Sequence, residues 1–350
     1  MSWSATDIAD LVTSTLKDLG RLKWTDLLLD WQELYALPQL LKKERVSMQS
    51  GIGIQHQLAV NTVDNAKNVK LGQVDDVNFG DTMTSITVPW RHTTTAYPFE
   101  RREVLMNRDP ARILDLIKAR RITHGIVPLA KKVETNFWGT ISDDGETPFG
   151  VQYWIVYNAS TGFYGGNHSA FSAGPGGLSA TTYSRWRNWT AQYTSVTKED
   201  LIAKWRQAYR ECGWMPASPD IPQYDRGARR WVNYVNGETI QALETIGESQ
   251  NENLGRDLAS MDGQMTFRRT PIQWVPYLES YSTSDPIWMI DWSVFYFVVL
   301  DGDYLHESTV FPAAKQHNMT EIHIDLTYNT ICDNRRRLGL IAKADPANGI

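Results

Sequence analysis

Three short segments of this 350-residue chain resemble catalytic or phosphate-binding motifs. Ser195-Val-Thr-Lys198 matches the Ser-x-x-Lys pattern of a nucleophilic serine, but the companion motifs are absent and Thr197 is better placed to cap a helix. Gly51-Ile-Gly53 and Gly174-Pro-Gly-Gly177 lack the third glycine and the following Lys-Ser/Thr with which a loop holds phosphate. We interpret these two segments as turns and the serine motif as a chance match.

A cluster of carboxylates gives an alternative function. Asp143, Asp144 and Glu146 could supply the acid and the base of a glycosidase, which uses a pair of carboxyl groups. A carbohydrate-active enzyme is therefore the alternative from another class, although a solvated acidic loop is the commoner meaning of such a cluster. The aromatic residues that would accompany these carboxylates are Phe137, Trp138 and Trp154.

The histidines and cysteines show no metal-binding spacing. Neither His-Glu-x-x-His nor Cys-x-x-Cys occurs among them, so the sequence implies no metal and no cofactor. Cys212 and Cys332 are expected in a helix and a strand, which favours buried free thiols in a reducing compartment. The histidines, expected at the surface or in hydrogen bonds, are His56, His92, His124, His168, His306, His317 and His323.

The composition is that of an ordinary globular protein with about two domains. The formal net charge is −5, the isoelectric point is near 5.8, and 42% of the residues are hydrophobic. The longest apolar runs, such as Val298–Leu300, are far shorter than the ~20 residues that cross a bilayer. The start of the chain also lacks the basic and apolar regions of a secretory signal. The sequence thus predicts no membrane span.

One stretch departs strongly from the acidic balance. Between Arg101 and Lys132, nine cations stand against three anions (Glu103, Asp109 and Asp115), a net of +6. An anionic partner along this stretch is one interpretation, and a solvated charged face is the commoner one. The cations are Arg101, Arg102, Arg108, Arg112, Lys118, Arg120, Arg121, Lys131 and Lys132.

The basic stretch lies largely on a predicted long helix, Asn107–Trp138. Asp109 can cap its start and Pro110 suits its first turn, and apolar side chains recur at nearly helical spacing behind them. Pro128 removes a helical hydrogen bond and clashes with the carbonyl of His124, so we expect a kink there. A helix of this length suits a structural strut.

In the segment before this helix, apolar and polar residues alternate along the chain, which indicates half-buried strands. One alternating segment starts at Val46, a second covers Thr82–Trp90, and together they predict one long hairpin, Val46–Ala96. Because an isolated two-stranded hairpin is marginal in water, we expect its apolar face to lie on a neighbouring subunit. The side chains expected on that face are Met48, Ile52, Ile54 and Leu58.

Capping and alternation predict the remaining elements. The first 45 residues predict helices whose apolar patch, Trp24–Leu37, must dock on this subunit or on a neighbour. Thr197–Asp200 resembles a capping box ahead of a helix that Gly213 closes. The predicted elements are a strand at Val151–Tyr157, helices at Leu201–Cys212 and Thr239–Ile246, and strands at Met265–Leu278, Trp288–Leu300 and Ile322–Cys332.

Three of these segments resemble a known family. Met265-Thr-Phe-Arg-Arg-Thr-Pro-Ile-Gln-Trp-Val-Pro-Tyr-Leu278 has a short strand, a proline and a second strand. Pro286–Trp292 carries an aromatic-Asp-Trp passage, and Asp325–Arg337 is a closing strand with an Asn-Arg-Arg tail. Together with the order of arm, hairpin, basic helix and mixed domain, they resemble the major capsid proteins of tailed double-stranded DNA bacteriophages. Only Gly139–Gly177 is longer than that family leads us to expect.

The resemblance implies an α+β fold of the Hong Kong 97-like type, with a long spine helix and an extended β-hairpin loop. Residues 1–45 would form the amino-terminal arm and residues 46–104 the extended loop. Residues 105–190 with 310–350 would form the peripheral domain, which holds the spine helix, and residues 191–309 the axial domain.

The function implied by the resemblance is structural, without enzymatic activity. Copies of the chain would form the hexamers and pentamers of an icosahedral shell around the phage genome, assembled in the bacterial host cytoplasm and matured from a procapsid to the virion. Further candidate partners are scaffolding, portal and decoration proteins; because the chain begins with Met1, scaffolding is expected to be separate or absent. An encapsulin-like compartment is an alternative with the same fold.

Two sets of residues are expected to carry these contacts. The hairpin side chains Met48, Ile52, Ile54 and Leu58 would lie on the neighbouring subunit. The spine helix would meet the packaged double-stranded DNA through non-specific phosphate contacts, which release counterions and therefore weaken with salt. The cations expected to face the DNA are Arg112, Lys118, Arg120 and Arg121.

Overall fold

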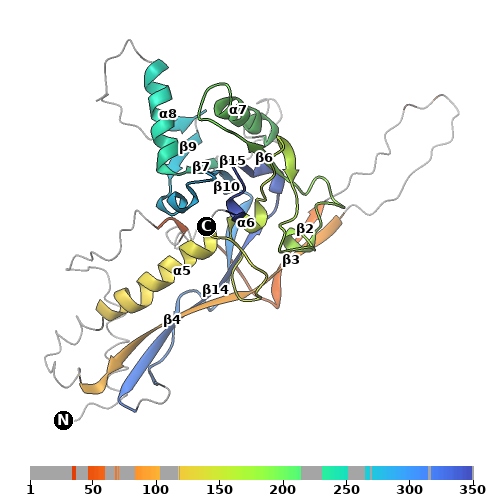
Figure 1. Ribbon diagram of the computed structural model, residues 1–350. Helices are drawn as coiled ribbons and strands as arrows, with labels where there is room; N and C mark the ends of the chain where they lie inside the picture. The colour runs from red at the N-terminus through yellow and green to blue at the C-terminus, as the bar shows by residue number, and fades with distance from the viewer. Residues whose placement is uncertain are drawn as a thin grey trace.

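The computed structural model describes residues 34–36, 46–59, 68, 70, 83–102, 117, 119–213, 231–250, 265–268, 270–313 and 317–348. Expectations for residues 1–33, for the start of the long helix with Asp109, Pro110 and Arg112, and for Lys118 lie outside these ranges. The described residues form two large sheets and a separate hairpin (Figure 1). Among them, no helix is both long enough and apolar enough to cross a membrane.

A six-stranded sheet is built around one long strand, β14 (Met319–Cys332). β14 pairs antiparallel with β4 (Arg91–Glu100) from Met319↔Glu100 to Tyr328↔Arg91, and with β11 (Phe295–Leu300). The strand predicted at Ile322–Cys332 is therefore confirmed. Its burial alternates only up to Asp325, because both faces are covered from Leu326 onward. The sheet also contains β1 (Val46–Gln49), which pairs with β11, and the two-residue strands β12 (His306–Glu307) and β13 (Phe311–Pro312), which pair with β14.

The predicted single hairpin Val46–Ala96 is wrong in its extent. Its first strand, β1, pairs in parallel with β11, and its last part belongs to β4, which pairs with β14. Only β2 (Gly53–Ala59) and β3 (Met83–Pro89) pair with each other. The error has a physical cause: alternation shows that a strand is half-buried, but it does not show which strand is its partner.

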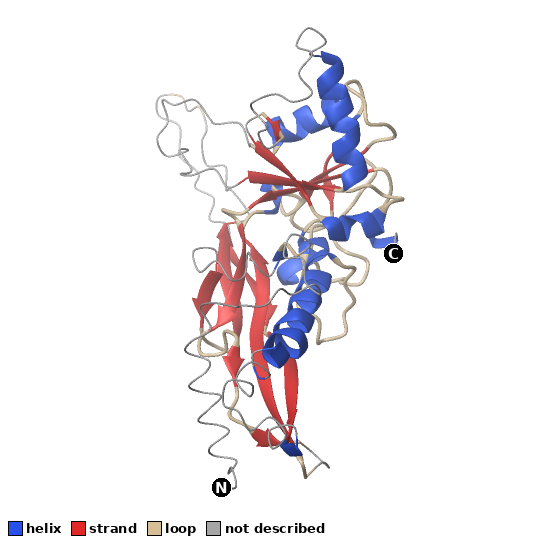
Figure 2. Cartoon of the chain, turned by 90° about the vertical axis from the view of Figure 1, so that its left-hand side faces the viewer, coloured by secondary structure: helices blue, strands red, loops and turns tan. Residues whose placement is uncertain are grey.

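A seven-stranded mixed sheet forms the other half of the molecule, with strand order β5-β6-β15-β10-β7-β9-β8. Figure 2 shows helices α7 (Leu201–Glu211) and α8 (Gly237–Gln250) beside this sheet, and α5 along the longer one. Both predicted helices are confirmed, and α8 is longer than expected. The strands are β5 (Gly162–Gly165), β6 (Asn188–Gln192), β7 (Trp231–Val235), β8 (Thr266–Phe267), β9 (Thr270–Trp274), β10 (Ile287–Asp291) and β15 (Gly339–Ala342).

The spine helix is present in its described part, as a π-helical turn, η2 (Arg121–Ile126), followed by α5 (Val127–Trp138). The irregularity expected at Pro128 is this wide turn, and the hydroxyl of Thr95 donates to the carbonyl of His124 at 3.1 Å. That carbonyl, which Pro128 cannot bond, is thus satisfied. Gly125 lets the turn approach β14, because a Cβ there would lie 2.8 Å from Cδ1 of Ile324.

Two sequence predictions fail where burial overrides local pattern. Val151–Tyr157 is not a strand: Val151–Trp154 forms one helical turn, α6, whose residues are all buried. A short apolar run does not distinguish a buried helical turn from a buried strand. The predicted strand Trp288–Leu300 is two strands in different sheets, since a turn at Trp292–Val294 separates β10 from β11.

The strand predicted at Met265–Leu278 is likewise divided. It contains β8 and β9 and then a 3₁₀ turn, η5 (Pro276–Tyr281). Pro276 stands in the first turn of η5, where its fixed φ and missing N–H are tolerated. The Asp301-Gly302 turn after β11 is present, and Gly302 has φ +91°, which glycine adopts without strain.

The end of the amino-terminal segment docks on this subunit. Leu34, Tyr35 and Ala36 are buried in the main core. The backbone N–H groups of Tyr35 and Ala36 donate to Oε2 of Glu134 at 3.0 and 2.5 Å, and the indole of Trp138 donates to Oε1 at 2.8 Å. Burial raises the pKa of Glu134 to about 7, although these three donors act in the opposite direction. For these three residues, docking on this subunit is confirmed.

The two cysteines are free and buried, as predicted. Cys212 is the residue just after α7 and Cys332 ends β14, and burial raises the pKa of both thiols. Because the thiolate is the reactive form, neither cysteine should react with a thiol reagent at neutral pH while the chain is folded. A thiol titration should therefore give no rapid reaction in buffer and two reacting groups in denaturant. Rapid labelling of either thiol in the folded protein would contradict this assignment.

Candidate functional site

The four hairpin side chains chosen from the sequence do not form one exposed strip. Ile54 is fully buried and Leu58 packs against the core, whereas Ile52 is fully exposed and Met48 is about half exposed. The prediction that all four side chains contact a neighbouring subunit is therefore wrong for Ile54. Its side chain already lies in the core of its own subunit.

The even-numbered face of the hairpin is covered by this subunit. Ile54 pairs with Val88 and His56 pairs with Ile86 across the hairpin, and Nδ1 of His56 lies 3.3 Å from Oδ1 of Asp333. Gly176, from the long irregular segment, lies against Ile86 so closely that a Cβ there would be 2.9 Å from Cβ of Ile86. The alternation was thus interpreted correctly within β2 and β3, but the surface that covers their buried face belongs to the same subunit.

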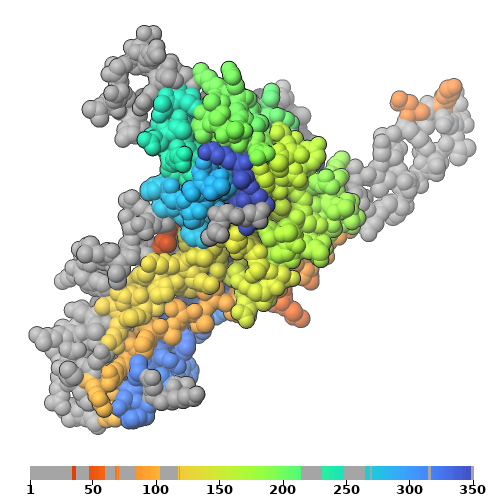
Figure 3. Space-filling view, in the orientation of Figure 1, coloured from red at the N-terminus to blue at the C-terminus, as the bar shows by residue number. Residues whose placement is uncertain are grey.

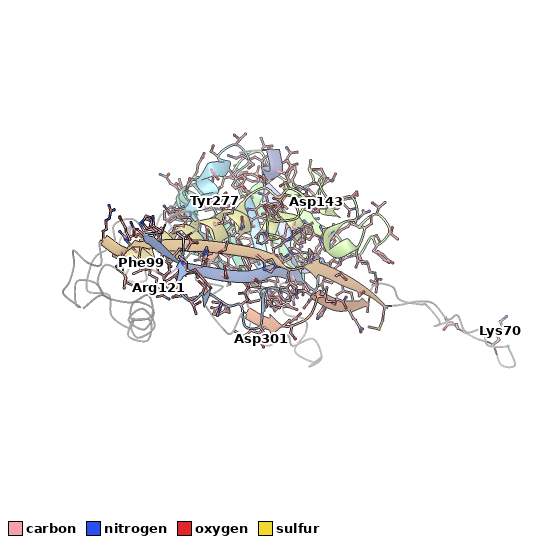
Figure 4. All side chains as sticks on the ribbon, turned by 90° about the horizontal axis from the view of Figure 1, so that it is seen from below. Lys70, Phe99, Arg121, Asp143, Tyr277 and Asp301 are labelled. Atoms are coloured by element: carbon pink, nitrogen blue, oxygen red, sulfur yellow. The ribbon has the colours of Figure 1, made fainter. Side chains whose placement is uncertain are left out.

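Apolar side chains nevertheless remain exposed at both ends of the hairpin. Ile52 lies in the bend before β2, and Met83 begins β3, where it pairs with Ala59. Lys70 lies far from the body of the protein, at the opposite end from Arg121 (Figure 4). Other exposed large apolar residues, which the sequence did not single out, are Tyr164, Trp274 and Phe311.

Two of the four cations proposed to face an anion are described, and both make contacts within the subunit. Nε of Arg121 donates to Oε1 of Glu307 at 2.6 Å, and the hydroxyl of Tyr97 donates to Oε2 of the same carboxylate at 3.3 Å. A nitrogen of Arg120 donates to the carbonyl of Pro98 at 3.0 Å. These contacts tie η2 to β4 and β12. In the described part of this basic stretch, the exposed cations are Arg101, Arg102, Lys131 and Lys132.

The tail Asn334–Arg337 contains the most heavily bonded side chain of the described core. Arg335 is fully buried, and its guanidinium makes its shorter backbone hydrogen bonds to three carbonyls, at 2.7, 2.7 and 2.9 Å, and donates to Oδ1 of Asn188 at 3.0 Å. Those carbonyls belong to Trp154, Trp186 and Gly166. One arginine thus holds the long irregular segment to the end of β14. Sequence reasoning recognised the motif but assigned the residue no role.

A second arginine of the tail joins the two sheets. A nitrogen of Arg337 lies 2.8 Å from Oδ2 of Asp291, and both side chains are almost completely buried. The indole of Trp231 also donates to this carboxylate, at 2.9 Å. Asp291 ends β10, and Arg337 lies between β14 and β15, so the pair fixes the junction at which the chain passes between the sheets.

Two of the residues considered for catalysis, Asp144 and Ser195, take part in local turns. Oδ1 of Asp144 accepts from the backbone N–H groups of Glu146 and Thr147, and Oδ2 accepts from the hydroxyl of Thr147. These hydrogen bonds, of which the one from the hydroxyl has the largest effect, hold the pKa of Asp144 well below its usual range. Ser195 donates its backbone N–H to Asp200 at 3.0 Å, within the turn before α7. The aromatic residues of the glycosidase alternative, Phe137, Trp138 and Trp154, are buried and present no sugar-stacking surface.

Among the described residues, no group of three or more His, Cys, Asp or Glu side chains is placed so that it could hold a metal ion.

The capping prediction before α7 is partly right. The hydroxyl of Thr197 accepts the N–H of Asp200 at 3.2 Å, while Asp200 itself precedes the first residue of the helix. Gly213 follows the helix with φ +69°, as expected of a helix-ending glycine.

Solved structures resemble this chain over nearly its whole length. The capsid asymmetric unit of cyanophage A-1(L) covers 94% of this chain and 98% of its own, with a TM-score of 0.64 and 13% identity. The capsid of the native GTA particle covers 93% and 94%, with a TM-score of 0.57 and 10% identity. The structure of Mycobacterium phage Bobi covers 97% of each chain, with a TM-score of 0.52 and 11% identity.

The sequence itself has no comparable match. No known protein-family profile matches the chain, and no curated protein matches its sequence. The similarity is therefore one of fold. The chain has the α+β, Hong Kong 97-like capsid fold that its motifs predicted, with the long sheet and spine helix in one part and the seven-stranded sheet in the other.

Proposed function

We propose that this chain is the major capsid protein of a tailed double-stranded DNA bacteriophage and that its copies form the hexamers and pentamers of an icosahedral shell. The observation that carries the proposal is the capsid fold over nearly the whole chain. The exposed apolar side chains Ile52 and Met83 at the ends of the hairpin support it, since in an assembly a neighbouring copy can cover them. An encapsulin-like compartment and a carbohydrate-active enzyme are less favoured.

The two sheets suggest how the parts divide. We assign the six-stranded sheet and the spine helix to the peripheral domain, and the seven-stranded sheet to the axial domain. Sheet membership crosses the boundaries expected from the sequence: β11 pairs in the long sheet, whereas β5, β6 and β15 pair in the seven-stranded one. The buried pair Arg337–Asp291 lies where the chain crosses between them.

Electron microscopy of the purified chain tests the proposal. We expect closed shells or rings, because contacts between copies of the chain would cover its exposed apolar residues. Light scattering should show an assembly that persists on moderate dilution at physiological salt. A monomer that stays dispersed over the same concentrations would count against a capsid role. An encapsulin-like compartment would instead form shells without nucleic acid.

The spine helix is proposed to line the interior and to meet DNA phosphates without reading sequence. Charge reversal at Arg112 and Lys118, as Arg112→Glu with Lys118→Glu, should lower the DNA content of particles more than their number. Removing one phosphate-binding cation should reduce the slope of log K against log salt by about 0.9. DNA binding measured over a salt series checks this. An unchanged slope and an unchanged DNA content would argue that the helix faces elsewhere.

Arg121 serves as the contrasting variant. Because it forms an ion pair with Glu307 inside the subunit, Arg121→Glu should lower subunit stability as well as positive charge. A lower DNA content in this variant alone would therefore not distinguish the two effects. The comparison with Arg112 and Lys118 separates contact with DNA from the support of η2.

A further inference from the structure

The spine helix carries a buried carboxyl group, that of Glu134, with no cationic partner among the described residues. Its Oε2 accepts the backbone N–H groups of Tyr35 and Ala36 at 3.0 and 2.5 Å, and its Oε1 accepts the indole N–H of Trp138 at 2.8 Å. Two of these three hydrogen bonds come from residues 99 and 98 positions earlier in the chain. Glu134 is therefore the polar anchor of Leu34–Ala36 on the spine helix.

Three aromatic side chains receive the ring of Tyr35 and form an aromatic box. The ring centroid of Tyr35 lies 4.6 Å from that of Tyr234 on β7 and 6.1 Å from that of Trp138 on α5. It lies 6.3 Å from that of Trp292, in the turn between β10 and β11. Figure 3 shows a small red-orange part of Leu34–Ala36 between yellow α5 and the light blue part of the chain. The segment thus contacts both the spine helix and the seven-stranded sheet.

No opposite charge compensates the buried carboxyl group. Lys131 and Lys132, on the same helix, are exposed, and no charge on β4 or α6, which also pack on α5, is among the causes of the Glu134 pKa shift. From η5, Tyr277 is close enough for the charge of Glu134 to help burial raise the pKa of its hydroxyl. Tyrosine hydroxyls such as those of the aromatic box are uncharged near neutral pH. An ionised Glu134 is therefore stabilised by hydrogen bonds alone and is opposed by burial.

The hydrogen bonds to the segment are compatible with a protonated carboxyl group. Oε1 has one donor and can carry the proton, so Oε2 becomes a carbonyl oxygen whose two lone pairs accept the N–H groups of Tyr35 and Ala36.

Docking of the segment changes the proton affinity of this group. Burial raises the pKa of Glu134 to about 7 and outweighs the hydrogen bonds, which lower it. Without Leu34–Ala36, Oε2 would meet water, and the pKa would move toward the ordinary glutamate value of about 4.3. The docked state therefore binds a proton more tightly than the undocked state.

We propose that Glu134 is a proton-sensitive anchor: docking of Leu34–Ala36 between the spine helix and the seven-stranded sheet is coupled to the uptake of one proton by this carboxyl group. Because the docked state has the higher pKa, its advantage is fully present below the pKa of the undocked state and is lost as the pH rises through about 7. Release of the segment also removes contacts between the two halves of the subunit. The inference concerns a single subunit and does not rest on the proposed function.

Amide hydrogen exchange of dispersed subunits tests the proposal. The protection of the Tyr35 and Ala36 amides, corrected for the intrinsic exchange rate, should fall about tenfold from about pH 6 to about pH 8.5, as the loss of one proton requires. In Glu134→Gln, which keeps an acceptor oxygen but cannot ionise, the same protection should change by less than about twofold. Glu146→Gln, which removes an exposed carboxyl group, should retain the wild-type fall.

Two controls separate docking from general unfolding. The amides of β14 report opening of the whole subunit, and their protection should not fall in parallel with that of Tyr35 and Ala36. Infrared spectra of the wild type minus Glu134→Gln should show the carbonyl band of a protonated carboxyl group at the acidic end of the range and lose it at the basic end. If the variant does not fold, the wild-type comparison of Tyr35 and Ala36 with β14 still decides. Constant or rising protection of these two amides, an equal fall in β14, or an equal fall in Glu134→Gln overturns the proposal.

Discussion

Arg335→Met should lower the free energy of unfolding by about 3–5 kcal/mol, whereas Arg336→Met, one residue away, should change it by less than about 1 kcal/mol. The guanidinium of Arg335 is fully buried and is the donor for the carbonyls of Trp154, Trp186 and Gly166. Methionine keeps most of the apolar stem but leaves these acceptors unpaired, which costs about 1–3 kcal/mol for each that water cannot reach.

Arg336 is a close control because it belongs to the same turn. Its guanidinium is partly exposed and lies over the ring of Phe163, 3.9 Å from the centroid, so its loss removes one surface contact. Urea unfolding of dispersed subunits, followed by tryptophan fluorescence, measures both variants. Equal, small effects at the two positions would show that Arg335 does not hold the irregular segment to β14.

Ile52→Asp should reduce the yield of closed shells at least tenfold while leaving the subunit folded. Ile52 is fully exposed in the bend before β2, so its side chain supports no packing within its own subunit. Burial of such a side chain in a partner contributes about 1.5–3 kcal/mol, and a shell repeats the contact in every copy. Shell yield by sedimentation and the fold by circular dichroism are the two measurements. Normal assembly of Ile52→Asp would exclude this residue from the contact.

Ile54→Asp, two residues further along the chain at a buried position, should instead destabilise the fold of the subunit. Ile54 is fully buried against Val88, so an aspartate there should destabilise the subunit by more than about 3 kcal/mol. In a double substitution of Ile52 and Ile54, a loss of shells could therefore come either from a lost intersubunit contact or from an unfolded subunit. Gln55→Asp, exposed on the opposite face of β2, controls for the added charge alone. A folded, stable Ile54→Asp subunit would show that this part of the hairpin is not core.

The sequence by itself determined the local elements that capping and alternation specify. Helix α7 follows from its polar start and its closing Gly213, and β14 follows from the alternation that begins at Ile322. The spine helix and the irregularity near Pro128 follow from helical spacing and from the missing proline donor. The capsid fold was predicted because short motifs occurred in the expected order, with no need of side-chain contacts.

Only the tertiary structure decided which elements are partners. The alternation of residues 46–96 predicted strands, but pairing over a long sequence separation assigned β1 to β11 and β4 to β14. The same contacts determined that Ile54 is internal and Ile52 external, although both lie at even positions. Nothing in the sequence indicated that Arg121 has an ionic partner, because that partner, Glu307, is 186 residues away in the chain. A side chain's periodicity fixes its direction relative to its own strand or helix, whereas what it meets depends on chain segments that are distant in sequence.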